Sequence, residues 1–524
     1  MKHFKFLSVI VVLALVLAGC TDDNGSKKDE PYTGEPGSIS IIGIPSAGAT
    51  LGVDTSQLNR KGTVQYRWVI GDDIDNPLFD STIRPTKDHL GKTVSVRVRR
   101  SDWAESVTSL TETSDVIVRG WMVKTIATEN HLDAPFAGIR SVGVDSNGMV
   151  YTSDSRFIYK IDPETGDISS FFDSGSGFSG SPKYLAVGPD NSIYMPEMWW
   201  WWNVRRYFAN GTAAPPPGVE IFKDMFYYGV SAFDAKNYPN GSGNGTAGGD
   251  SKPFENAMEG GFAVDEDGNI YVGAIYHERS IIKVVPRVYD GTNFVSHQTV
   301  SLLAGGVRLA DALRPFSDGT QTDFYTGPIG ISSDAIDLNG TPGTVAIASS
   351  ARFHDFGGMA AGGGYLYVTD THNDSRIRKI NTTTGLTTTL TGGDWDYRDG
   401  PLASAAFTNT KAIAYGSDGN LYVVDRTGAE ADRGPVIRKI DLEIGMVSTI
   451  AGNANSAGLI DGFALDGARF QANIEGIAFY DHPELGSIIF IADKAAGDRD
   501  SANAAIRMLF WDNSTEPVDT EEND

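Results

Sequence analysis

The feature that most constrains the fold of this chain is a short unit that recurs between residues 121 and 511. Each unit has a β-prone run, a turn rich in Asp, Gly and Asn, a second run, a loop and a third run. The units start near Ile139, Tyr184, Phe262, Gly364, Ala412 and Gly476. Several continue into a fourth run that ends like Thr449–Gly452 or Leu302–Gly305. Four-stranded units at this spacing predict a β-propeller.

The number of units predicts six blades, and a seventh blade within residues 306–361 is the alternative. The second unit departs furthest from the repeat. The segment Asp370–Ile380 reads Asp-Thr-His-Asn-Asp-Ser-Arg-Ile-Arg-Lys-Ile and resembles the signature of the NHL-repeat family, a match that is best over residues 362–511. This resemblance implies an all-β, six-bladed NHL-like β-propeller.

The two ends of the repeat region complement each other. The last unit stops at Trp511 with three strands, whereas Met122–Ala127 resembles a fourth strand but precedes the first unit. Pairing these segments would close the ring and cover both sheet edges, which an open propeller would leave exposed. We therefore place the propeller at residues 121–511 and expect the acidic tail, residues 512–524, to fray.

The N-terminus has the features of an export signal. Residues 1–19 combine a basic start, an apolar run over Phe6–Leu17 and small residues, a pattern too short for a permanent membrane helix. Leu17-Ala18-Gly19-Cys20 resembles the bacterial lipobox, which implies cleavage before Cys20 and lipidation of its sulfur. Because Cys20 is the only cysteine, internal disulfides and cysteine-based zinc sites are excluded.

Residues 20–36 are polar and contain Gly and Pro, as expected of a flexible tether. The pair Asp22-Asp23 resembles the acidic export tag of surface lipoproteins in Bacteroidetes. The resemblance implies a lipid anchor in the outer membrane with the protein exposed at the cell surface.

Residues 37–119 form a separate β-rich segment. Val64–Ile70 and Thr93–Arg99 alternate apolar and polar residues, as half-buried strands do. The combination of Tyr66-x-Trp68 with Leu90–Val96 resembles bacterial immunoglobulin-like domains. That resemblance implies an immunoglobulin-like β-sandwich with Trp68 in its core. We expect it to act as a spacer.

The charge balance limits the partners. The chain has 43 Lys and Arg against 67 Asp and Glu, a net charge of −24 at neutral pH. Binding to a phosphate backbone requires clustered cations, so we expect no nucleic-acid partner.

Aspartates recur at one position of the unit, after its second strand: Asp154, Asp370, Asp425 and Asp493. A ring of such carboxylates could hold calcium, or each could cap a turn within its own blade, the reading we favour because the residue recurs. The Asp-Gly-Asn segments at 267–269 and 418–420 are expected to be hairpin turns. No cofactor is predicted, although calcium stays possible.

Two aromatic segments depart from the repeat and are the candidate ligand-binding residues. The first contains Trp199, Trp200, Trp201 and Trp202 with Arg205 and Arg206, and the second contains Trp395 and Tyr397. Adjacent strand residues point to opposite faces, so the four tryptophans cannot all enter one core. They either stack on sugar rings or fill space between the second blade and residues 209–258.

We therefore expect a surface lipoprotein that binds polysaccharide or oligosaccharide and assists a glycan-uptake system. Binding is favoured over catalysis, for which the scattered histidines provide no metal-hydrolase motif. Two alternatives remain: a calcium-assisted lactonase- or lyase-like enzyme, and a scaffold that docks on proteins such as an outer-membrane transporter.

Overall fold

The computed structural model describes residues 31–59, 61–128, 139–154, 157–173, 184–196, 204–207, 261–274, 280–285, 299–305, 345–346, 351, 353–371, 375–426, 434–495 and 504–517. These residues are all-β apart from η1, a three-residue 3-10 turn at Lys87–His89. Cys20, the tryptophans at 199–202, His372 and residues 306–344 lie outside the described residues. The chain divides into two compact units, Met1–Gly120 with Asp512–Asp524, and Trp121–Trp511.

The first unit contains two antiparallel sheets. One pairs β1 (Ser40–Ile42) with β2 (Gly52–Asp54), and the other has the order β3 (Val64–Ile70), β4 (Thr93–Arg100) and β5 (Leu110–Val116). Val94, Val96 and Val98 are fully buried around Trp68, as the alternation in these strands predicts. The indole of Trp68 donates a hydrogen bond to the carbonyl of Asp80 at 2.9 Å, which satisfies its one polar atom.

The start of the acidic tail is held in this unit, which corrects the expectation that the whole tail frays. The guanidinium of Arg119 pairs with Asp512 at 2.9 Å and donates to the carbonyls of Glu516 and Pro517 at 2.8 and 2.7 Å. The Arg119 side chain thus provides hydrogen-bond donors to three acceptors within residues 512–517.

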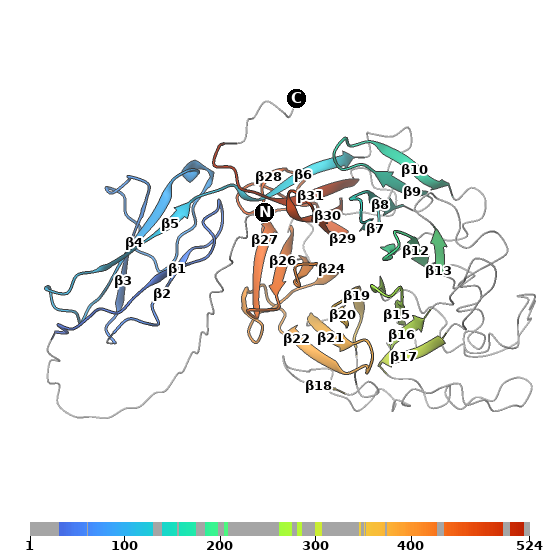
Figure 1. The fold of residues 1–524 in the computed structure, drawn as a ribbon, viewed down its shortest axis with the longest axis horizontal. Coiled ribbons are helices and arrows are strands. Elements are labelled where there is room, and N and C mark those ends of the chain that lie inside the picture. The colour runs from blue at the N-terminus through green and yellow to red at the C-terminus, as the bar shows by residue number, and fades with distance from the viewer. Residues whose placement is uncertain are drawn as a thin grey trace, which may run out of the picture. The chain divides into compact units, whose positions relative to one another are not determined.

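The described residues of the second unit form six antiparallel sheets, numbered here in chain order (Figure 1). Sheet 1 has β7 (Ser141–Val144), β8 (Val150–Ser153), β9 (Phe157–Ile161) and β10 (Ile168–Asp173). Sheet 2 has β11 (Ala186–Val187), β12 (Ile193–Pro196) and β13 (Val204–Tyr207). Sheet 3 has β14 (Phe262–Val264), β15 (Ile270–Ala274), β16 (Ser280–Val285) and β17 (Thr299–Ala304).

The last three sheets each have a fifth, outermost strand. Sheet 4 has β19 (Phe356–Gly362), β20 (Tyr365–Asp370), β21 (Arg376–Asn381), β22 (Thr387–Gly392) and β18 (Val345–Ala346). Sheet 5 has β24 (Thr410–Tyr415), β25 (Leu421–Arg426), β26 (Pro435–Asp441), β27 (Met446–Gly452) and β23 (Gly400–Pro401). Sheet 6 has β29 (Asn473–His482), β30 (Gly486–Lys494), β31 (Ala504–Asp512), β6 (Gly120–Thr128) and β28 (Gly462–Phe463).

The sheets follow one another around a centre. Their first strands, β7, β11, β14, β19, β24 and β29, contact one another in a closed series. Strand β6 from the start of the unit lies between β31 and β28, which confirms the predicted ring closure. Repeated antiparallel sheets arranged in this way form a β-propeller.

Glycines allow neighbouring inner strands to approach closely. A Cβ at Gly476 of β29 would lie 2.7 Å from the backbone nitrogen of Val142 in β7. A Cβ at Gly358 of β19 would lie 2.8 Å from the carbonyl oxygen of Lys411 in β24. Side chains at these positions would push adjacent sheets apart.

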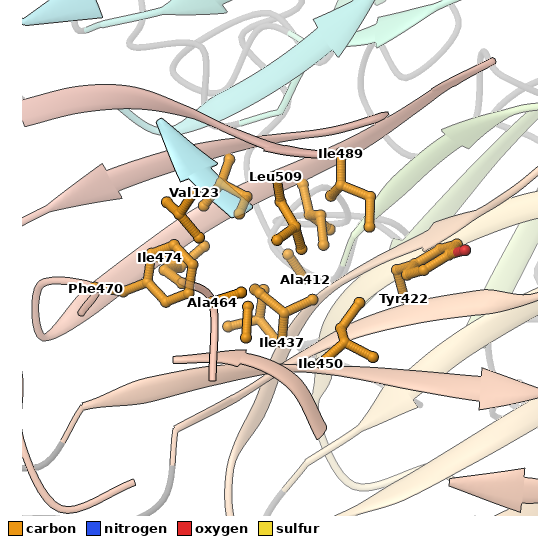
Figure 2. Close-up of a cluster of buried hydrophobic side chains, with 14 of the residues drawn as sticks. Val123, Ala412, Tyr422, Ile437, Ile450, Ala464, Phe470, Ile474, Ile489 and Leu509 are labelled. Carbon is orange, nitrogen blue, oxygen red and sulfur yellow. The ribbon is translucent and has the colours of Figure 1, made fainter. Parts of the chain in front are cut away.

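An apolar cluster packs between sheets 5 and 6 (Figure 2). Val123 of β6 meets Phe470, Ile474 and Leu509 on the side of sheet 6, and Ile437 of β26 faces them from sheet 5. Strand β6, which closes the ring, therefore contributes to the core as well as to the hydrogen bonds of sheet 6.

Candidate functional site

The loop between sheets 4 and 5 contains Trp395 and Tyr397, two of the predicted ligand residues. Strand β22 ends at Gly392, and the positive φ angles of Gly392 and Gly393 (89° and 115°) turn the chain away from it. The following segment, Asp394–Asp399, is called the aromatic loop below. It leads directly into β23 at the edge of sheet 5.

Arg438 of β26 anchors the aromatic loop from below. Its Nε and Nη2 donate to Oδ1 of Asp399 at 3.1 and 2.8 Å, and Nη2 also donates to the carbonyl of Arg398 at 2.6 Å. Nη1 donates to Asp425 at 3.0 Å and to the carbonyl of Ala406 at 2.5 Å. All five N–H donors of this fully buried guanidinium therefore have an acceptor.

Additional hydrogen bonds and ion pairs fix the rest of the aromatic loop. Arg398 pairs with Asp396 at 2.8 Å and with Asp394 at 3.1 Å, and its Nε donates to the carbonyl of Ser404 at 2.8 Å. Asp399 also accepts the backbone N–H of Thr449 at 2.8 Å. The loop is cross-linked along its whole length, so it holds its side chains in defined positions.

Trp395 and Tyr397 share this loop but point to different surroundings. Trp395 is 52% exposed. The ring of Tyr397 lies against the Arg438 guanidinium, 5.2 Å from its centre, and its hydroxyl is 2.7 Å from that of Thr449. Burial raises the pKa of Tyr397. Trp395 is thus available to a ligand, while Tyr397 supports the loop from inside.

The same support recurs in sheet 6 without the tryptophan. There Arg507 of β31 donates to Asp493 at 2.8 Å and to Asp461 at 2.6 Å, and Asp461 accepts the N–H and hydroxyl of Thr125 at 2.8 and 2.9 Å. Asp461 is the counterpart of Asp399. Trp395 lies four residues before Asp399, and the residue four before Asp461 is Ala457. The exposed aromatic is an addition to a repeated scaffold.

Of the other predicted ligand residues, Arg205 and Arg206 belong to sheet 2, and the tryptophans at 199–202 lie outside the described residues. The structure places Arg205 in β13 and pairs Arg206 with Asp190, with the Arg206 guanidinium 5.5 Å from the centre of the Tyr194 ring. Burial opposes the ionisation of Asp190, but Arg206 and the hydrogen bonds from Ser192 together outweigh it and lower the pKa of that carboxyl. Arg206 is therefore separate from the aromatic loop and already engaged within its own sheet.

The recurring aspartates serve buried pairs. Asp370, Asp425 and Asp493 pair with Arg378, Arg438 and Arg507 at 2.9, 3.0 and 2.8 Å. Burial raises the pKa of each carboxyl, that of Asp493 to about 7, and the paired arginine opposes this shift. In sheet 1, Asp154 instead accepts the Tyr159 hydroxyl at 2.9 Å. Each of these aspartates therefore has its partner within its own blade.

The Asp-Gly-Asn segments are hairpin turns, as predicted. Gly268 and Gly419 have φ angles of 79° and 78°. Asp418 accepts from the side chain of Asn420 at 2.9 Å and from the Tyr422 hydroxyl at 2.7 Å. Within the described ranges, no group of three His, Cys, Asp or Glu side chains could hold a metal ion. In the same part of the chain, no helix has the length and apolar character needed to cross a bilayer.

No family model and no curated protein matches the chain. A crystal structure of a protein of unknown function from Bacteroides thetaiotaomicron is similar, with 16% identity, 92% of this chain and 100% of that chain covered, and a TM-score of 0.47. The WD40 β-propeller domain of Doa1 covers 79% of this chain and 88% of its own at 10% identity and a TM-score of 0.29. A chain of the mitotic checkpoint complex covers 74% and 93% at 10% identity and a TM-score of 0.33. The fold described above rests on this chain's own strand order and contacts.

Proposed function

We propose that this protein binds polysaccharide or oligosaccharide through loops of its propeller. The observation that carries the proposal is the aromatic loop, which presents Trp395 half exposed on a backbone fixed by Arg438 and Arg398. An aromatic face covers the apolar face of a sugar ring, and the neighbouring carboxylates of Asp394 and Asp396 can accept bonds from its hydroxyls.

A pre-formed loop favours binding because little conformational freedom is lost when the ligand arrives. Ordering a side chain and loop costs on the order of 0.5–1.5 kcal/mol for each immobilised group, and cross-links made in the free protein remove that cost. Tyr397 and Asp399 provide such links through Thr449. The tryptophans at 199–202 are proposed as a second contact with the same ligand.

The proposal places the protein at the cell surface. The lipobox-like segment ending at Cys20 supports an outer-membrane lipid anchor, and the tether after it supports presentation away from the membrane. We propose that residues 37–119 form an immunoglobulin-like spacer and that residues 121–511 form a six-bladed NHL-like propeller. The closed series of inner strand contacts supports six blades, because a seventh would interrupt it.

The test is affinity gel electrophoresis and calorimetry of purified protein against a panel of polysaccharides. Trp395→Ala is compared with Leu386→Ala, which removes an exposed apolar side chain at the turn between β21 and β22. We expect Trp395→Ala to weaken binding by roughly tenfold or more, as loss of a central aromatic contact does, and Leu386→Ala to leave it unchanged.

A second variant, Trp200→Ala with Trp201→Ala, tests the other aromatic segment. If neither variant changes the affinity for a glycan that the protein binds, the loops are not the binding site. If no polysaccharide binds, the glycan proposal fails and a protein-docking role takes its place, to be tested by pull-down from outer membranes.

A further inference from the structure

A cavity of about 100 Å³ lies between sheets 5 and 6. It is bordered by the start of β24 at Lys411, the end of β25 at Arg426 and the start of β29 at Asn473 and Glu475. One buried water needs roughly 10–15 Å³ of such space. The cavity is therefore large enough for several waters or for one compact charged group.

The charges around the cavity are unusual for so acidic a chain. Glu475 is paired with Lys494 at 3.1 Å, so its negative charge is already compensated. For Lys411 and Arg426, by contrast, the described residues provide no carboxylate within ion-pair distance. Two cationic side chains therefore border this cavity without an ion-pair partner among the described residues.

Arg426 also has a buried donor without an acceptor. Its Nε is shielded from solvent, and no acceptor among the described residues lies within hydrogen-bond distance. A buried donor on a charged group that lacks a partner destabilises the protein, so such groups normally have an acceptor. The side chain is half-buried, with its backbone held by Asn409 through an N–H···O bond of 3.1 Å.

The floor of the cavity strengthens any charge interaction inside it. Val424 and Ile474 line the cavity and belong to the apolar cluster between sheets 5 and 6. Ile474 is labelled in Figure 2. Apolar walls lower the local dielectric, and attraction between opposite charges grows as the dielectric falls. A planar guanidinium additionally matches carboxylate or sulfate oxygens in geometry.

We propose that this cavity is an anion-binding site that takes one carboxylate or sulfate group, held by Arg426 and Lys411. The anion is either a free inorganic ion or the acidic substituent of a sugar. The site lies between sheets 5 and 6, whereas the aromatic loop joins sheets 4 and 5. The inference does not depend on neutral-glycan binding at Trp395.

The experiment is calorimetry of the purified protein with three probes: glucuronate, glucose and inorganic sulfate. Glucuronate and glucose differ in the carboxylate at one carbon, so they isolate the contribution of the charge. We expect glucuronate or sulfate to bind and glucose not to bind at this site. Binding of both anions identifies a general anion site, sulfate alone identifies a free inorganic ion, and glucuronate alone identifies an acidic sugar.

Four variants test the assignment. Arg426→Gln should reduce anion affinity roughly tenfold or more, as loss of a charge-assisted hydrogen bond does, and Lys411→Gln should reduce it severalfold. Glu475→Gln should increase it, because the change removes the carboxylate from the lining and frees Lys494 from its ion pair. Lys124→Gln, which removes an exposed lysine of β6 outside the cavity, should leave it unchanged.

Two results would overturn the proposal: failure of both anions to bind, or equal anion affinity in Arg426→Gln and the unmodified protein. Thermal melting checks that each variant is folded. Trp395→Ala should keep its anion affinity, so failure of the glycan proposal and failure of the anion proposal are separate outcomes.

Discussion

Arg438 shows how much of the candidate site depends on a single residue. It holds Asp425, which is fully buried, and the aromatic loop at the same time. Arg438→Met would leave the Asp425 charge buried without its partner, a change that costs about 3–5 kcal/mol. We expect the free energy of unfolding, measured with urea, to fall by that order.

The control is Arg398→Met, which removes pairs with Asp394 and Asp396, both more than half exposed. Exposed pairs contribute about 0–1 kcal/mol, so this variant should change stability little. The double variant Arg438→Met with Asp425→Leu should recover part of the lost stability, because neither charge is then buried alone. Equal losses in the two single variants would contradict the assigned role of Arg438.

The sequence predicted the recurring aspartates but not their partners. Asp370 faces Arg376 across the sheet, Asp425 faces Val436, and Asp493 faces Ala505. The paired arginines stand two residues further on, at 378, 438 and 507, and so point to the same face. The number of residues between each aspartate and its arginine varies with the length of the loop between the two strands. The recurrence of the pair therefore becomes visible only when the strand pairing is known. In sheet 1, Tyr159 faces Thr152 and bonds Asp154 with the same offset of two residues.

At the scale of elements, the decisive strand is β6, which completes sheet 6 from the other end of the unit. Asp461 connects it to the sheet by accepting from Thr125 of β6 and from Arg507 of β31. We expect Asp461→Ala to increase the rate of amide hydrogen exchange in Trp121–Ala127 by about tenfold, since bonds to a charged group contribute roughly 1.5–3 kcal/mol.

Sheet 5 provides a matched control. Asp399 makes the same bonds to Thr449 of β27, but β27 is joined to β26 by a short turn and cannot separate independently. Asp399→Ala should therefore accelerate exchange in Ser448–Ala451 less than Asp461→Ala does in β6. Equal acceleration in the two variants would show that β6 is held in sheet 6 as firmly as β27 is held in sheet 5.

The sequence revealed the closing strand because Met122–Ala127 has the same pattern as Thr449–Gly452. It did not reveal the outermost strands β18, β23 and β28, each of which has two residues and so no measurable periodicity. The sequence did not reveal the anion cavity either, because its lining comes from four strands whose approach depends on packing between two sheets. Trp395 could be found from the sequence because it departs from the repeat.

At the scale of the whole molecule, several blades share a second contact. In each of them, a buried tyrosine of one strand donates a hydrogen bond to an aspartate of the preceding turn. Tyr151 donates to Asp145 at 3.0 Å, and Tyr271 donates to Asp265 at 2.8 Å. Tyr422 repeats the contact in sheet 5. Burial raises the pKa of all three hydroxyls, and the neighbouring carboxylate adds to the shift. Each phenol is thus held in its neutral form.

These shifts predict a steep loss of stability in alkali. Burial raises the pKa of Tyr194 and of Tyr367 to about 12, from 10.0. Below pH 10 the phenols are neutral in both states, whereas above it only those of the unfolded chain ionise, so the free energy of unfolding falls as the pH rises. The full loss is about 3 kcal/mol for each such group and is complete only above pH 12, and about half of it falls between pH 9 and pH 11. Urea unfolding at about pH 9 and about pH 11 measures the loss, and Tyr367→Phe, which removes one titrating group beside Tyr415, should reduce it. Lysine deprotonation in the same range affects both proteins equally, so an unchanged pH dependence in Tyr367→Phe would contradict the assignment to buried tyrosines.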